Sequence, residues 1–303
     1  MPAAHGQKNL ATLLVVLAAT AWSTAPYFVR VLPYDSWTIL FWRGVFGTTL
    51  IMLCLFAIQG RALFGDLLRL GGRGFVVAAL STLGMTVFVP ALQFTSAANV
   101  AVINATGPFV TAALAWIFLQ EASRPRTLIA SAVALTGVAT IVGGAHGGAD
   151  LRGIALAALM TVAIAGMTVV VRHHRETPMA AASALSSLLG SVVSIPFAHG
   201  ITSVTPHDLF LFVGFGFQIA IGLTCFIVGS RLLPSGQAAL IATLETPLMP
   251  FWIFVAFGEV PAAHQLIGGA LVLGAVIADI LGELRRTRRA EAAVVTAGYR
   301  RVM

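Results

Sequence analysis

The stretch 235–259, SGQAALIATLETPLMPFWIFVAFGE, constrains the fold more than any other part of the chain. It has the length and hydropathy of a membrane-spanning helix, but Glu245, Pro247 and Pro250 interrupt its middle. Glu245 lies about 15 Å along such a helix at about 1.5 Å per residue, close to the middle of a bilayer. A charged side chain there costs at least about 2.5–3.5 kcal/mol on insertion scales, and a short carboxylate cannot reach the headgroups. Glu245 must therefore face protein groups or water.

The same pattern occurs earlier in the chain, in residues 96–121, SAANVAVINATGPFVTAALAWIFLQE. Pro108 falls where Pro247 does, 139 residues earlier (247 − 108), and a glutamate ends each stretch, Glu121 and Glu259. Two copies of one pattern indicate an internally duplicated chain. We expect a first five-helix repeat over 1–145, a second over 146–284 and a basic cytoplasmic tail over 285–303.

The composition is typical of a membrane protein, with 10% charged and 58% hydrophobic residues against about 25% and 45–50% in soluble domains. A cleaved signal peptide competes for the first apolar segment, but its apolar run exceeds the roughly 7–15 residues of a signal h-region. We predict ten membrane-spanning helices, near Leu10–Leu32, Trp37–Ile58, Phe75–Phe94, Ala97–Leu119, Thr127–Val142, Leu151–Val171, Met179–Phe197, Leu209–Arg231, Gln237–Phe257 and Leu266–Glu283.

Basic residues predict the orientation of these helices. With the N-terminus in the cytoplasm, fifteen Lys and Arg residues fall on the cytoplasmic side, only Arg30 and Arg152 fall outside, and Arg43 lies within a span. This bias is a positive-inside signal, so we expect a multi-pass protein of the bacterial inner (plasma) membrane with both termini cytoplasmic. The basic residues lie in short loops and the tail, and they predict no nucleic-acid partner.

Five spans per repeat is an odd number, so the second copy enters the membrane in the opposite orientation. The predicted fold is an all-α membrane protein of ten helices in two inverted five-helix repeats. Inverted repeats with interrupted helices at corresponding positions are typical of secondary transporters, whose substrates bind near the midplane.

The chain resembles ten-helix EamA-type members of the drug/metabolite transporter superfamily, and among them the amino-acid exporters. The likeness rests on Trp22–Ser23, Arg43, NATGPFVTAALAWIFLQE at 104–121, and LETPLMPFWIFVAFGE at 244–259 with the QLIGGALVLGAVI run that follows. It implies export of amino acids or similar small amphipathic metabolites by alternating access. The alternatives are a nucleotide-sugar or drug carrier of the same superfamily and, ranked below these, an integral-membrane enzyme that modifies lipid. EamA sequences often place the carboxylate directly before the proline, whereas Thr246 intervenes here.

The candidate site residues fall into three groups. We expect Trp22, Phe88, Asn104, Gln218, Glu245 and Trp252 to bind substrate, and Pro108, Pro247 and Pro250 to act as hinges; Arg43, Gln93 and Asn99 are left undecided.

Each candidate also has a structural interpretation. Glu245 can be a structural carboxyl bonded to a neighbouring helix or to backbone freed by the prolines. Arg43 lies about 9 Å below the outer end of its helix, within snorkelling reach of the headgroups. For the amides Gln93, Asn99 and Gln218, interhelical hydrogen bonding is the alternative, and Phe88 can simply pack.

No enzyme signature is found in the sequence: it has no phosphate-binding glycine loop, no His and Glu at metal spacing and no serine–histidine–acid set. We therefore expect no catalytic residues, no cofactor and no metal. The expected partners are a small-molecule substrate, such as a neutral or aromatic amino acid, the lipid bilayer, and protons as a candidate coupling ion.

Overall fold

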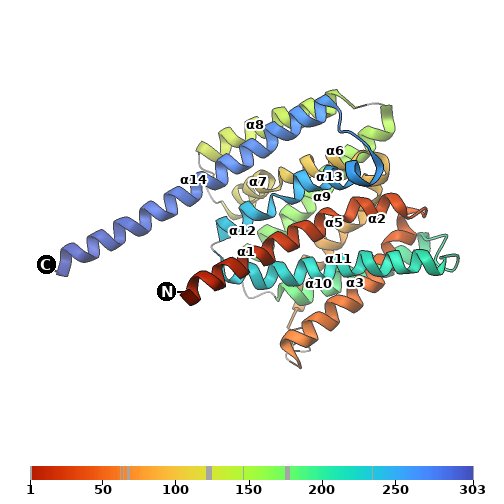
Figure 1. Ribbon diagram of the computed structural model, residues 1–303, viewed down its shortest axis with the longest axis horizontal. Coiled ribbons are helices and arrows are strands. Elements are labelled where there is room, and N and C mark those ends of the chain that lie inside the picture. The colour runs from red at the N-terminus through yellow and green to blue at the C-terminus, as the bar shows by residue number, and fades with distance from the viewer. Residues whose placement is uncertain are drawn as a thin grey trace.

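The protein is a bundle of helices lying roughly along one direction (Figure 1). The computed structural model describes residues 2–61, 63, 65–66, 69–120, 125–145, 147–174, 178–233 and 235–302, and every regular element among them is helical. The elements are α1 Pro2–Ser23, α2 Ala25–Val31, α3 Ser36–Gln59, α5 Gly71–Phe94, α6 Ala97–Ala105, α7 Gly107–Leu119, α8 Pro125–Gly143, α9 Gly147–His173, α10 Met179–Ser194, the 3-10 helix η1 Ile195–Phe197, α11 Pro206–Arg231, α12 Ser235–Ala242, α13 Glu245–Phe257 and α14 Ala263–Val302.

Nine helical stretches in the described residues are long and apolar enough to cross a membrane, and Ala181–Phe197 is a shorter apolar tenth. The prediction of a ten-helix membrane protein is confirmed. Within this tenth stretch the α-helix α10 ends at Ser194 and gives way to η1, since Pro196 supplies no backbone donor to continue it.

The distribution of side chains is that of a bundle in lipid. Large apolar side chains face outward, among them Phe118 at 72%, Leu135 at 68% and Phe210 at 75% exposure. Many interior positions hold alanine instead, such as Ala18, Ala78 and Ala157. Small residues let helix backbones approach closely, which is how helices associate where lipid removes the hydrophobic drive between them.

The two halves of the chain interlock, and their contacts come in mirrored pairs. Helix α5 of the first half packs on α9 of the second, and its counterpart α11 packs on α1. Helix α10 packs on both α3 and α5, and α3 packs correspondingly on both α10 and α11. This exchange symmetry is expected of inverted repeats.

Helices α8 and α14, the last span of each half, lie side by side (Figure 1). Their closest approach is at Gly137 and Gly268, where a Cβ on Gly137 would come 2.7 Å from the Gly268 carbonyl oxygen. A Cβ on Gly268 would come 2.6 Å from the Gly137 carbonyl oxygen. The glycines therefore fix this contact, since any larger residue would force the helices apart.

Both chain ends lie at the same end of the bundle (Figure 1). Helix α14 continues to Val302, so residues 285–302 of the basic tail extend this helix beyond the bundle. Glu121, which the repeat pattern places at the end of the fourth span, lies outside the described residues.

Candidate functional site

Three spans are broken near their middle, two of them at the predicted places. The fourth span divides at Thr106 into α6 and α7, and the ninth divides at 243–244 into α12 and α13. The first span also divides, at Thr24, into α1 and α2. The sequence analysis missed this break, although Pro26 two residues later was a signal for it.

At each break a threonine hydroxyl donates a hydrogen bond to a backbone carbonyl oxygen. Thr106 Oγ1 donates to the Ile103 carbonyl oxygen at 2.7 Å, and Thr243 Oγ1 donates to that of Leu240 at 2.6 Å. Thr24 Oγ1 donates likewise to the Ala21 carbonyl oxygen at 2.7 Å. Carbonyl groups released inside a membrane need such partners, because lipid supplies none.

The prolines begin the second half of each span. Pro108 is the second residue of α7 and Pro247 the third of α13, positions where a missing N–H costs no helical hydrogen bond. Pro250 lies inside α13. The break at Thr106 places Asn104 in α6 and Pro108 in α7, so the two residues lie on different helical segments.

Asn104 and Glu245 lie at the breaks. Asn104 is half-buried near the end of α6, and Glu245 is half-buried as the first residue of α13. Because α6 packs against α13, the first half of the fourth span meets the second half of the ninth.

Trp22 and Arg43 line one interior cavity of about 120 Å³. Trp22 reaches it from α1 and lies against α11, where a Cβ on Gly222 would come 2.6 Å from Trp22 Cδ1. Serines of α5 and α10 supply hydroxyls, and the other lining side chains are mainly aliphatic. The cavity therefore combines one cation, several hydroxyls and apolar surface.

Arg43 does not snorkel, so that interpretation of this residue is wrong. Its side chain is 6% exposed, and its guanidinium lies over the rings of Phe88 and Phe215, 5.6 and 4.9 Å from their centroids. Phe88 is buried and packs under this cation. Cation–π contact with the two rings holds the side chain inward.

Gln218 and Trp252 line a second, largely apolar cavity of about 550 Å³ beside α2, α11 and α13. The Trp252 Nε1–H donates to Ser23 Oγ at 2.8 Å, which links α13 to the end of α1. Gln218 is buried, and its Oε1 has no hydrogen-bond partner among the described residues. The structure thus places these two residues around a different cavity from Trp22.

Gln93 and Asn99 lie toward the predicted outer end of the bundle. The exposed Gln93 hydrogen-bonds Ser36 and donates to the Tyr34 carbonyl oxygen at 3.1 Å. Asn99 is buried and donates to Thr95 Oγ1 at 2.8 Å and to Asp150 Oδ1 at 3.3 Å. Both amides join neighbouring helices and loops, and neither lies at a break.

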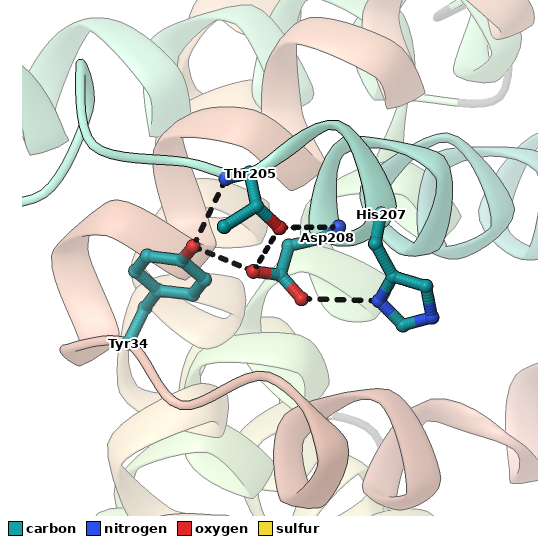
Figure 2. Close-up of polar contacts among 4 residues, drawn as sticks. All are labelled: Tyr34, Thr205, His207 and Asp208. Atoms are coloured by element: carbon teal, nitrogen blue, oxygen red, sulfur yellow. Dashed lines mark hydrogen bonds and ion pairs between the residues drawn. The ribbon is translucent and has the colours of Figure 1, made fainter.

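Polar contacts between the two halves gather at this end. The Tyr34 hydroxyl donates to Asp208 Oδ2 at 2.8 Å, and Thr205 Oγ1 bonds the same oxygen at 2.7 Å (Figure 2). Arg30 and Glu259 form an ion pair. Burial, then the hydrogen bond to Asp208, raises the pKa of Tyr34. These contacts tie the end of the first span to α11 and to the end of α13.

Two groups of polar residues were missed by the sequence analysis. One is this set of polar contacts, whose residues lie in loops and at helix ends and therefore gave no periodic signal. The other is the serine face of α10, formed by Ser183, Ser186, Ser187 and Ser191. Its signal was a hydroxyl every three or four residues along an apolar helix, the spacing of one helical face.

Comparison with protein families gives one match. The EamA-like transporter family model matches residues 9–143 and again 151–278. The comparison with curated proteins found no match. A solved structure described only as "Crystal structure of protein" is 18% identical, with a TM-score of 0.62 over 91% of this chain and 98% of that one. At that identity the likeness concerns the fold alone.

Proposed function

The chain belongs to the EamA-like transporter family, and from this premise we propose that it exports amino acids or similar small amphipathic metabolites from the bacterial cytoplasm. Transport proceeds by alternating access between two inverted repeats, for which we keep the boundaries 1–145 and 146–284. The observation that carries the proposal is the pair of broken spans, α6/α7 and α12/α13, which meet through α6 and α13. Discontinuous helices of opposed repeats are where secondary transporters bind their substrates.

Glu245 is the proposed ligand of a substrate amine. It is an ionisable group at the middle of a membrane span, and such groups are functional by default. Asn104 supplies an amide at the corresponding break, while Trp22, Phe88 and Trp252 offer apolar surface and Gln218 a buried amide. A few polar groups set among aromatic residues suit a ligand with a polar head and an apolar body.

The proposed movement rocks the repeats about Pro108, Pro247 and Pro250. The ion pair Arg30–Glu259 and the Tyr34–Asp208 hydrogen bond join different halves of the chain at one end of the bundle. Opening of that end requires both contacts to break. Their position supports a gate there, separate from the break residues.

The orientation is part of the proposal: the end that carries both termini faces the cytoplasm. Single cysteines test it in a background that lacks Cys54 and Cys225. We expect an impermeant thiol reagent added to intact cells to label Gly148→Cys and to spare Ala290→Cys. The reverse pattern would invert the topology.

Counterflow tests the function directly. Proteoliposomes loaded with an unlabelled neutral amino acid should accumulate the labelled one, while protein-free vesicles should not. Several neutral amino acids should compete, because a methylene difference in an apolar site is worth only about 1–3 kcal/mol. A nucleotide sugar and a strongly acidic solute should not compete. Exchange of a nucleotide sugar or a lipid, with no amino-acid exchange, would overturn the assignment.

A further inference from the structure

The cavity of about 120 Å³ beside Arg43 has the features of a site for a small anion. It lies among α1, α3, α5, α10 and α11, and we call it the Arg43 cavity. Arg43 and serine hydroxyls form its polar part, while Trp22, Leu40, Ile219 and Leu223 form its apolar part.

Arg43 is a buried cation without an anionic partner. It is 6% exposed, and its Nε makes no hydrogen bond in the described part of the chain. Its Nη2 contacts only a weak acceptor, Met85 Sδ, at 3.4 Å, and it forms no ion pair with a described carboxylate. Cation–π contact with Phe88 and Phe215 offsets part of the desolvation cost. A buried charge is normally paired, so an anionic group of a ligand would complete this site.

The Ser81 hydroxyl lines the cavity and can donate into it. Ser186 Oγ donates to Ser81 Oγ at 2.9 Å, and Ser186 is itself 4% exposed. Because Ser81 accepts this bond, its own proton is available to a ligand in the cavity. Neutral donors next to one guanidinium favour a single negative charge over a dianion.

The shape of the cavity favours a carboxylate on an organic body. A guanidinium fork matches the two oxygens of a carboxylate, and the apolar part provides contact for an alkyl group. Free space reaches the backbone of α10, since a Cβ on the buried Gly190 would meet no atom within 4 Å. Helix α1, which carries Trp22, also packs against α12 and α13 on either side of the Glu245 break.

We infer that the Arg43 cavity binds the carboxylate of the exported solute, with Arg43 as its cation and Ser81 as a neutral donor. This inference rests on the proposed function, because it assigns the carboxylate end of the exported zwitterion. It also accounts for a buried arginine next to a hydroxyl-lined space.

The test uses two measurements on purified wild-type protein, Arg43→Gln and Gly190→Leu. The first is thermal unfolding in detergent with sodium isovalerate, sodium chloride or isobutylamine hydrochloride at equal ionic strength. We expect isovalerate alone to raise the midpoint of the wild type by a few degrees and to leave both variants unchanged. Gly190→Leu fills the cavity without touching the charge, so the test survives if Arg43→Gln fails to fold. Gly274→Leu is the matched control, because a Cβ there also meets nothing and the residue is exposed on α14.

The second measurement is competition in counterflow by leucine and by leucinamide, which lacks the carboxylate. In the wild type and Gly274→Leu, leucine should compete at least tenfold more strongly than leucinamide. In Arg43→Gln the two should compete alike, with residual exchange above that of protein-free vesicles.

The outcomes separate the two proposals. If the wild type exchanges no amino acid but isovalerate stabilises only proteins with the intact cavity, the anion site stands and the proposed function fails. If amino acids exchange and Arg43→Gln keeps the preference for leucine, the function stands and this inference fails. Stabilisation by chloride equal to that by isovalerate would also overturn it, because the site would then bind a simple halide.

Discussion

The two broken spans follow one plan but differ in the residue two positions before the proline. In the first repeat that residue is Thr106, 9% exposed and bonded within its own turn. In the second it is Glu245, half-buried, with its backbone in the first turn of α13. The break, the hydroxyl cap and the proline are shared, so they belong to the scaffold. The carboxyl group occurs only in the second repeat, at Glu245, so a role in shaping the broken helix does not explain it.

Among the changes that test this comparison, replacement of Glu245 should have the largest effect on transport. Glu245→Gln keeps the shape of the side chain and removes its charge. A charge-assisted hydrogen bond is worth about 1.5–3 kcal/mol, so we expect transport to fall about tenfold or more. The measurement is counterflow in proteoliposomes, with size-exclusion chromatography to verify folding.

Thr106→Val is the matched control in the first repeat. It should reduce stability slightly through loss of the bond to the Ile103 carbonyl, while transport changes less than about twofold. Full transport by Glu245→Gln, with the pH profile of the wild type, would assign Glu245 a structural role. An equal loss of transport in Glu245→Gln and Thr106→Val would mean that the residues at the breaks only shape the helices.

The two repeats also differ at the start of their second spans, α3 and α10, and we expect a smaller effect from this difference. Asp35 caps α3 and accepts hydrogen bonds from the backbone of Trp37 and Thr38, both at 3.0 Å, whereas α10 begins after Pro178 without a side-chain cap. Burial opposes ionisation of Asp35, but hydrogen bonds from Thr38, Trp37 and His199 outweigh it and lower the pKa of this carboxyl.

A lowered pKa in the folded state fixes the sign of the pH dependence. The stabilisation is present above the unfolded pKa, about 4, and is lost as pH falls through the folded value. Asn also caps helices well, so Asp35→Asn should cost about 1 kcal/mol or less at neutral pH. The difference in unfolding midpoint between wild type and variant should shrink below about pH 4. A difference independent of pH down to pH 3 would contradict the assigned role.

The sequence predicted the helices, their duplication and two of the three breaks, because apolar length and proline position act locally. It left Arg43 undecided, because Phe88 and Phe215, the rings that hold its guanidinium inward, come from other spans. It left Gln93 undecided between lining a site and interhelical hydrogen bonding, and the structure has that residue in the last turn of α5, hydrogen-bonded to Ser36 and Tyr34. The grouping of side chains around cavities depends on helix rotation, which weak amphipathic patterns in lipid-exposed helices do not specify.

The smallest effect is expected where α7 and α13 end. Both are followed by a residue in the left-handed region, Gln120 with φ 55° in the first repeat and Gly258 with φ 69° in the second. An L-residue pays about 1–2 kcal/mol for that conformation, and glycine does not. Gln120 recovers part of this cost, since its Nε2 donates to the Ile117 carbonyl oxygen at 3.0 Å. Glycine also has more conformational freedom to lose on folding.

We therefore expect Gln120→Gly to stabilise the protein by only about 0.5 kcal/mol, and Gly258→Ala to destabilise it by about 1 kcal/mol. Thermal unfolding of both variants in one detergent measures the pair. A lower midpoint for Gln120→Gly would mean that the side-chain hydrogen bond outweighs the backbone strain, and that the first repeat ends its broken span by a different device from the second.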